Sequence, residues 1–305
     1  MGSEMCIRDR RAADLVCATL SGAALRVLGD AAIAFDAIVV DEASQATEPQ
    51  LLVVLQRLAR GGTLVLVGDE QQLPPCCLSP RVAAAGGARS ALRRLCALGA
   101  PSRACALDTQ YRMHPDISAV PARRFYAGAL RDGCTALERA APWHAPRACG
   151  LGTLAWHDVC APCAQSKAGS FYNRVEAELV ASLVHALSSR WPAARVVALT
   201  PYRAQVSELR AAYRARSAPR DGECTPHAQL PDGCFCTIDS FQGREADAVF
   251  LSTVRSAHAS VGFVADARRL NVGLTRARLS AIVVGDARAL ARSSDDWAEV
   301  VAHAK

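Results

Sequence analysis

Two adjacent carboxylates, Asp41 and Glu42, follow an apolar run at residues 37–40. At the end of a strand, one such carboxylate can hold Mg²⁺ while the other accepts a proton from an attacking water. The alternative is a solvated acidic pair ahead of a helix that begins near Glu48 and Pro49, because proline suits the first turn of a helix. Taken alone, the pair leaves both interpretations open.

A second apolar run, residues 64–67, leads into a polar loop that starts at Gly68 and contains Gln72. A glutamine side chain at such a strand end can contact the γ-phosphate of a nucleotide. The Gly-Asp and Pro-Pro pairs of this loop are also ordinary turn signals, so the loop by itself indicates only a turn. Its place one strand after the acidic pair favours a role beside that pair.

Two arginines farther along the chain are of a kind that phosphoryl transfer uses. Arg112 lies between potential stacking residues in the segment 108–115, and Arg276 belongs to the arginine-rich segment 268–278, which predicts the start of a basic helix. A planar guanidinium that keeps its charge suits a phosphoryl group in transfer. For the run 268–278 taken alone, a solvated basic face is the simpler interpretation.

The elements that position these residues alternate between short β-branched runs and longer amphipathic stretches. This pattern is typical of βαβ units with a parallel sheet buried on both faces. We expect helices over residues 173–190 and 202–216, and irregular chain over 140–169 and 217–233, which are rich in Pro, Ala and Gly. The predicted strands are residues 37–40, 64–67, 104–107, 195–199, 236–238, 249–253 and 281–284.

The simplest organisation is an α/β chain of two lobes, residues 11–105 and 106–305. The first ten residues, MGSEMCIRDR, fit no element and are interpreted as an extraneous leader. No apolar run approaches the ~20 residues that span a bilayer, and no signal-peptide pattern is present. We therefore expect an intracellular protein, cytoplasmic or nuclear, without a membrane partner.

The composition allows a globular chain and a polyanionic partner. Its 305 residues are 51% hydrophobic and 21% charged, enough for one or two ordinary cores. The net charge of +6 permits a nucleic-acid partner without requiring one. Of the 35 basic side chains only Lys167 and Lys305 are lysine, so any function that needs a particular lysine can be checked at two positions.

Thirteen cysteines raise the question of disulfides or zinc. Most stand singly in apolar contexts, where a buried reduced thiol is expected, as at Cys17, Cys96 and Cys105. Only His157, Cys160 and Cys163 have the spacing of metal ligands, with Cys149 or Cys134 available as a fourth. A single CxxC pair without a second is weak evidence, so zinc stays an alternative.

The order of the polar segments resembles motifs II, III, IV, V and VI of superfamily 1 helicases. The segments are DEASQATEP, VGDEQQLPP, QYRMHP, TIDSFQGREAD and RRLNVGLTRAR. They are most similar to the group that contains the nonsense-mediated-decay helicase, and the resemblance runs from about Val16 to Ala289. It implies two RecA-like P-loop NTPase lobes with parallel sheets, in a monomer that uses ATP and Mg²⁺ to move along single-stranded RNA or DNA.

The resemblance also implies roles for individual residues. Asp41 would hold Mg²⁺, Glu42 would activate water and Gln72 would sense the γ-phosphate, while Arg112 and Arg276 would be arginine fingers. The nucleotide contacts would come from Gln45, Tyr111, Gly243 and Glu245. The contacts to the strand, through hydroxyls and backbone amides that hold phosphates without reading bases, would come from Thr19, Ser21, Thr200, Pro201 and Tyr202.

One part of the family pattern is missing from the sequence. The family has a Gly-rich loop ending in Gly-Lys-Thr or Gly-Lys-Ser, whose amides and lysine hold the β- and γ-phosphates. Lys167 lies between Ser166 and Ala168, and Lys305 is the last residue, so neither can serve. We therefore expect a truncated first lobe and a chain that is inactive alone.

Three interpretations stay open. The first is a stretch of an ATP-dependent helicase, moving 5′ to 3′ by resemblance, and the five predicted catalytic residues favour it. The second is a non-catalytic nucleic-acid or protein binding module derived from a helicase, and the third is a zinc-dependent nucleic-acid binder. The sequence does not distinguish RNA from DNA, because phosphate contacts carry no base information. It indicates no protein partner.

Overall fold

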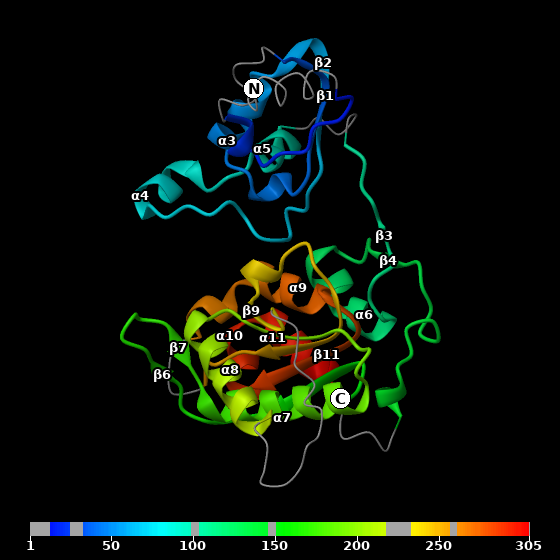
Figure 1. Cartoon of the computed structure of the whole chain (residues 1–305), viewed down its shortest axis with the longest axis vertical. Coiled ribbons are helices and arrows are strands. Elements are labelled where there is room, and N and C mark those ends of the chain that lie inside the picture. Colours follow the sequence, from blue (N-terminus) through cyan, green and yellow to red (C-terminus); the bar gives the residue numbers. More distant parts are fainter. Residues whose placement is uncertain are drawn as a thin grey trace, which may run out of the picture. The chain divides into compact units, whose positions relative to one another are not determined.

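The computed structural model describes residues 13–24, 33–98, 104–145, 151–217, 233–256 and 261–304. The chain divides into two compact units, Met1–Ala106 and Leu107–Lys305 (Figure 1). Residues 1–10, which were interpreted as a leader, lie outside the described residues. Among the helices of the described ranges, none combines the length and the apolar character needed to cross a bilayer.

The first unit is built around two parallel strands, β1 (Phe35–Val40) and β2 (Leu58–Leu66), in which Val40 pairs with Leu66. Helix α3 (Glu48–Leu55) connects them. This helix begins where the sequence predicts, because Thr47 and Gln50 form a capping box and a proline occupies the first turn. The carboxyl ends of both strands therefore lie side by side.

The strands bury one face and expose the other. Val40 is buried with Leu51 and Val54 of α3, and with Ala91 of helix α5 (Ala91–Ala97). Side chains at alternate positions point the opposite way, and Val39 is 66% exposed. The shorter elements of this unit are η1 (Gly22–Ala24), η2 (Ala43–Gln45), α4 (Pro80–Val82) and η3 (Ala83–Gly87).

The second unit contains a five-stranded, all-parallel sheet in the order β5-β11-β10-β8-β9. The strands are β5 (Leu154–Asp158), β8 (Val196–Thr200), β9 (Phe235–Thr237), β10 (Ala246–Ser252) and β11 (Ala277–Gly285). The three central strands are buried over most of their length. The predicted α/β class with a parallel sheet is confirmed.

Helices cover both faces of this sheet (Figure 1). Phe250 faces the core formed with α7 and α8, whereas Leu251, one residue on, lies against Gly273 of α9. Such double coverage explains why these strands appear in the sequence as continuous apolar runs. The helices are α6 (Pro115–Phe125), α7 (Arg174–Arg190), α8 (Arg203–Ser217), α9 (Ala267–Thr275), α10 (Ala287–Ser293) and α11 (Asp295–His303).

Short pieces complete the second unit. A parallel pair joins β3 (Thr109–Gln110) to β4 (Arg131–Asp132), and an antiparallel hairpin joins β6 (Ala164–Gln165) to β7 (Phe171–Tyr172). The remaining elements are the 3-10 turns η5 (Pro142–His144), η6 (Asp239–Phe241) and η7 (Gly262–Ala265).

Two predicted elements are wrong. Residues 104–107 form no strand, since no strand of the described ranges pairs with this apolar run and Leu107 is 87% exposed. The stretch 140–169, expected to be irregular, contains β5 and β6; β5 forms because it pairs with β11, more than a hundred residues later. The predicted loop 217–233 lies largely outside the described residues.

The cysteines also depart from expectation. Cys17, Cys96 and Cys105 are free thiols, but all three are exposed and not buried. All three lie in the first unit. A buried environment therefore cannot be inferred from apolar neighbours in the sequence alone.

Candidate functional site

In the first unit, the loops after β1 and β2 are held together by backbone hydrogen bonds. Ala43 N donates to Val67 O at 2.8 Å, and Val67 N donates to Val40 O at 2.9 Å. Gly68 allows this approach, because a β-carbon there would lie 2.8 Å from Ser44 N. The acidic pair and the second polar loop consequently occupy one edge of the unit.

The predicted Mg²⁺ and water-activating residues lie at this edge. Asp41 is exposed, and its Oδ1 accepts a hydrogen bond from Glu42 N at 2.9 Å. Glu42 has a left-handed backbone, with φ of 53°, and its carboxylate accepts from Gln45 Nε2 at 3.1 Å. Non-glycine residues adopt this conformation at a cost, and such residues cluster at functional sites. The structure thus brings Gln45 to Glu42.

The Asp41 carboxylate suits Mg²⁺ in its chemistry. Mg²⁺ prefers oxygen ligands and is commonly held by one or two carboxylates together with substrate phosphates. Asp41, beside Glu42 on the same turn, supplies such oxygens without a larger ligand cluster. In the described ranges no three His, Cys, Asp or Glu side chains gather as a ready-made metal site. A magnesium ion here would therefore need phosphate or water oxygens to complete its coordination.

The predicted γ-phosphate sensor is held by a residue that the sequence interpretation missed. Gln72 Nε2 donates to Asp69 Oδ2 at 2.9 Å, and the other carboxylate oxygen of Asp69 accepts from Gln71 N at 2.9 Å. The Asp69 carboxylate therefore fixes both the loop backbone and the amide of Gln72. The signal in the sequence was present, since an acidic residue directly follows the glycine at the end of β2.

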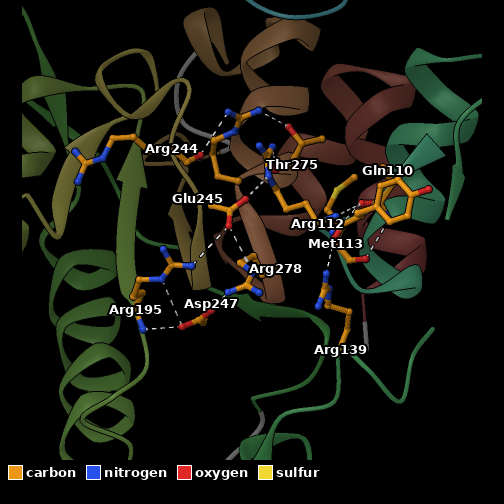
Figure 2. A network of polar contacts seen from close by, with 12 residues as sticks. Gln110, Arg112, Met113, Arg139, Arg195, Arg244, Glu245, Asp247, Thr275 and Arg278 are labelled. Carbon is orange, nitrogen blue, oxygen red and sulfur yellow. Dashed lines mark hydrogen bonds and ion pairs between the residues drawn. The ribbon is translucent and has the colours of Figure 1, made fainter. Parts of the chain in front are cut away.

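In the second unit, Glu245 receives arginines from three separate segments (Figure 2). Arg112 Nε donates to Glu245 Oε2 at 2.9 Å. Arg278 of β11 and Arg195, just before β8, lie 3.5 Å and 3.6 Å from Glu245 Oε1. Asp247 supports the same cluster, since its Oδ1 accepts from Arg278 Nη1 at 3.0 Å. The Glu245 carboxylate is therefore paired with these three arginines.

The charge of this cluster acts on the Glu245 carboxyl. Partial burial alone would raise its pKa, but the hydrogen bond and charge of Arg112, with the charges of Arg278 and Arg195, lower the pKa below its ordinary value. Glu245 is therefore ionised at neutral pH. To contact a nucleotide as predicted, the Glu245 carboxylate would have to bind the ligand while it stays paired with these arginines.

Both predicted arginine fingers make contacts within the second unit. Arg112 Nη1 donates to Thr275 O at 3.0 Å, next to Arg276 in the chain. Arg276 is only 2% exposed, and its Nε donates to Val272 O at 3.2 Å. The structure therefore brings the neighbourhoods of the two residues together, with the Arg276 guanidinium turned inward.

A solvated basic face, the simpler interpretation of the run 268–278, is wrong for most of its arginines. Arg276 is buried, Arg278 is paired with Asp247, and Arg269 donates to Asp266 Oδ2 at 2.6 Å. Arg269 also lies over the Phe263 ring, 3.8 Å from its centroid. The run is therefore an internal polar framework of helix α9 and strand β11.

Two further predicted nucleotide contacts, Tyr111 and Gly243, belong to the second unit. Tyr111 is 66% exposed, and its ring covers Gly133, where a β-carbon would lie 2.3 Å from the ring. Gly243 has φ of 75°, a conformation that favours glycine. The fourth predicted nucleotide contact, Gln45, belongs to the first unit.

The residues predicted to contact a nucleic-acid strand fall into two sets. Thr19 and Ser21 are exposed in the first unit, where Thr19 Oγ1 accepts from Gly22 N at 2.9 Å. Thr200, Pro201 and Tyr202 lie at the carboxyl end of β8 in the second unit. Thr200 is fully buried and its Oγ1 accepts from Tyr202 N at 3.4 Å. Thr200 therefore shapes the loop and does not present its hydroxyl freely.

The structure does not gather the predicted zinc ligands. His157 lies in β5, Cys163 Sγ accepts a hydrogen bond from Arg255 Nη1 at 3.9 Å, and the pKa of the Cys160 thiol is raised, chiefly by the charge of Asp286. A nearby negative charge opposes the thiolate that zinc requires. Cys149 lies outside the described residues. The described part of the cluster does not support the zinc hypothesis.

The sequence of the chain matches models of known protein families. Two family models, each described as an AAA domain, match residues 10–80 and 88–288. The chain is 36% identical to Helicase sen1 of Schizosaccharomyces pombe over 296 residues, covering 95% of this chain and 17% of that protein. It is also 36% identical to Regulator of nonsense transcripts 1 of Caenorhabditis elegans, covering 96% of this chain and 27% of that protein.

The chain thus spans less than a third of these relatives' length. Among solved structures, that of the PRRSV helicase is similar over 81% of this chain and 34% of its own, with 18% identity and a TM-score of 0.39. The family model that matches residues 88–288 covers more than half of the chain. The chain therefore belongs to the superfamily 1 helicases, in the group that contains the nonsense-mediated-decay helicase.

Proposed function

We propose that this chain is part of an ATP-dependent helicase that moves 5′ to 3′ along single-stranded RNA or DNA, in the cytoplasm or nucleus. The observation that carries the proposal is the edge of the first unit, where Asp41 and Glu42 after β1 lie beside the loop of Gln72 after β2. Ligands of open α/β sheets bind at such carboxyl ends. We further propose that the two units are RecA-like lobes.

The residues present would divide the chemistry of ATP hydrolysis among them. Asp41 would hold Mg²⁺, Glu42 would accept the proton of the attacking water, and Gln72 would contact the γ-phosphate. In the second unit, Arg112 and Arg276 would stabilise charge on the transferring phosphoryl group. Because Arg276 is buried against Val272 O, this role requires its guanidinium to leave that carbonyl. The nucleotide contacts proposed beside them are Gln45, Tyr111, Gly243 and Glu245.

A single strand would be held mainly through its phosphates. The proposed contacts are Thr19, Ser21, Thr200, Pro201 and Tyr202. In the second unit the buried Thr200 supports the loop by accepting from Tyr202 N, so the half-buried Pro201 would face the nucleic acid. Such contacts do not read bases. We expect binding without sequence preference, by a monomer.

Binding of single strands is tested with the full chain and labelled oligouridylate and oligothymidylate at several salt concentrations. We expect weak binding of both, with an affinity that falls steeply with salt, roughly 0.7 log units per log unit of salt for each phosphate neutralised. Failure to bind either strand at low salt would contradict the proposal. Tight binding that ignores salt, or a strong preference for one sequence, would contradict the phosphate-based mode.

The second candidate is a non-catalytic binding module derived from a helicase. The sequence holds no Gly-Lys-Thr or Gly-Lys-Ser, and its two lysines stand elsewhere. Joining the chain to an upstream lobe segment that contains a Gly-Lys-Thr phosphate loop separates the two candidates. ATP hydrolysis that is lost in Glu42→Gln supports the motor, and a fused protein that binds strands without hydrolysis supports the module.

A further inference from the structure

A group of polar side chains is completely buried at one end of the sheet in the second unit. Asn173 is 1% exposed, and Glu176, Gln205 and Ser252 are each 0% exposed. Asn173 caps α7, Gln205 lies in the first turn of α8, and Ser252 is the last residue of β10. The network therefore joins two helix starts to the end of a central strand.

Glu176 is the acceptor that β10 and its continuation depend on. Its Oε2 accepts from Ser252 Oγ at 2.7 Å and from Val254 N at 2.8 Å. Its Oε1 accepts from Asn173 Nδ2 at 3.3 Å. Three donors thus converge on one buried carboxyl, which is the condition under which a buried polar group becomes tolerable.

Gln205 carries the network to the loop after β8. Its Oε1 accepts from Asn173 N at 2.8 Å, and its Nε2 donates to Asn173 O at 3.1 Å and to Ser252 Oγ at 2.9 Å. Gln205 follows the loop 200–202 by three residues in the chain. The position of that loop is therefore tied to the same carboxyl as the end of β10.

The segment that Glu176 holds is strained. Val254 has φ of 71° and is fully buried, and a β-branched residue adopts this left-handed conformation only where its surroundings impose it. The hydrogen bond from Val254 N to Glu176 is such a constraint. Without it, the chain beyond Ser252 would lose a contact that offsets the strain.

The side chain after Val254 belongs to a series of ring contacts that reaches the loop 200–202. The Arg255 guanidinium carbon lies 4.0 Å from the centroid of the Phe171 ring, and that ring meets Tyr202 edge to face at 5.8 Å. Arg255 is 4% exposed, so it packs against the Phe171 ring and does not present its charge to solvent. Glu176 is connected to the 200–202 loop both through Gln205 and through this stack.

We propose that Glu176 is a positioning residue for single-strand binding: its buried carboxyl holds the loop 200–202 and the segment 252–255 in one fixed arrangement that fits a nucleic-acid backbone. A purely structural role would be met as well by an apolar side chain of similar volume, since burying a carboxyl is costly. The inference rests on the proposed function, because it names what arranges the strand-binding loop.

The test compares four forms of the full chain: wild type, Glu176→Ala, Glu176→Gln and Val184→Ala. Val184 of the same helix, 0% exposed in the apolar core, is the matched control, because its truncation removes core contacts of α7 and leaves the polar network in place. Each form is titrated with labelled oligouridylate, once at low protein for the dissociation constant and once at high protein for the fraction that binds. Ser252→Ala serves as a milder variant that keeps the Val254 bond, should Glu176→Ala fail to fold.

We expect Glu176→Ala to bind with full stoichiometry and a dissociation constant raised about tenfold, because fewer molecules hold the binding arrangement. Glu176→Gln keeps an acceptor oxygen and is expected to recover most of the affinity, and Ser252→Ala to lie between it and Glu176→Ala. Val184→Ala is expected to melt at a lower temperature with an unchanged dissociation constant.

Three results would overturn the inference. The first is wild-type affinity in Glu176→Ala, and the second is a loss of stoichiometry with an unchanged constant, as in a merely unstable protein. The third, should Glu176→Ala not fold, is wild-type affinity in Ser252→Ala. Absence of binding in the wild type would be a different outcome, since it would contradict the proposed function itself.

Discussion

Arg112 Nε donates to Glu245 Oε2 at 2.9 Å although 133 residues separate the two in the chain. The contact connects the segment ahead of α6 to the segment ahead of β10, and it draws in Arg195 and Arg278 (Figure 2). The Glu245 carboxylate, with Asp247 beside it, thus offsets the charges of three arginines that would otherwise repel one another. The contribution of this carboxylate to stability can be measured.

We predict that Glu245→Gln lowers the free energy of unfolding near neutral pH. The ion pairs of Glu245 are about a third exposed, so solvent screening limits the loss to roughly 1 kcal/mol or less. The pKa of Glu245 is lowered in the folded chain, so its contribution is present above the ordinary carboxyl pKa and is lost as the pH falls through the folded value. Urea unfolding at neutral and acidic pH, at low and high salt, measures it. A difference that grows in acid would contradict the assignment.

A second prediction concerns the pH dependence that Glu176 gives to stability. Burial raises its pKa to about 8, against the opposing hydrogen bonds of Val254, Ser252 and Thr253. A raised carboxyl pKa favours the folded state while the group is protonated. The stability contribution is therefore complete below the ordinary carboxyl pKa and declines as the pH rises through about 8.

Glu176→Gln removes this titration, so the variant is expected to lose less stability than the wild type between mildly acidic pH and pH above the folded value. Thermal unfolding across that range gives the comparison. Val184→Ala, as control, should be destabilised by a similar amount at every pH. Parallel curves for wild type and Glu176→Gln would mean that Glu176 is charged in the folded chain throughout.

The parallel sheet and most of the chemistry-bearing loops could be predicted from the sequence. Strands such as β8 and β11 are buried on both faces, so their apolar runs are visible without any knowledge of their neighbours. The polar loops that follow β1 and β2 were equally visible, because acidic and amide residues there interrupt apolar runs. The local sequence pattern was sufficient to predict a strand wherever several consecutive residues are buried.

What the sequence did not indicate depends on distant partners. Strand β5 has two buried residues and becomes a strand by pairing with β11. Glu176 looks like a solvated residue in the first turn of a helix, yet it is fully buried, and its hydrogen-bond donors come from Ser252 at the end of β10 and Val254 just after it. Arg276 likewise looked like part of a basic face. Each outcome is set by contacts that no local pattern contains.

A third prediction tests the Arg276 assignment in the protein fused to a segment with the phosphate loop. Arg276→Ala is expected to abolish turnover while nucleotide affinity changes by less than about tenfold, since an arginine finger acts on transition-state charge and can be worth ~10³–10⁵ in rate. Because Arg276 is buried and bonded to Val272 O, thermal unfolding of the variant must accompany the kinetics. An unchanged kcat in a folded variant would remove the assignment.

Arg278→Ala is the matched control for that experiment. Arg278 lies two residues away, on β11, and pairs with Asp247 and Glu245. Its removal should cost stability through the same framework, with turnover largely retained. Equal losses of kcat in both variants would point to a general disturbance of α9 and β11 in place of a specific role for Arg276.

The last prediction is that the chain as written does not sustain ATP hydrolysis, even with RNA or DNA present. A triphosphate would bring several negative charges to an edge where Asp41 and Glu42 are already acidic. Without loop amides and a lysine, the γ-phosphate is neither neutralised nor held in line with water, and phosphoryl transfer depends on that positioning and charge stabilisation. The sequence offers only Lys167 and Lys305, and Lys167 lies in the turn between β6 and β7 of the second unit. Phosphate release from purified monomer, with and without single strands, is measured beside Glu42→Gln. Sustained turnover that disappears in Glu42→Gln would prove the prediction wrong and would mean that another element of this chain supplies the phosphate site.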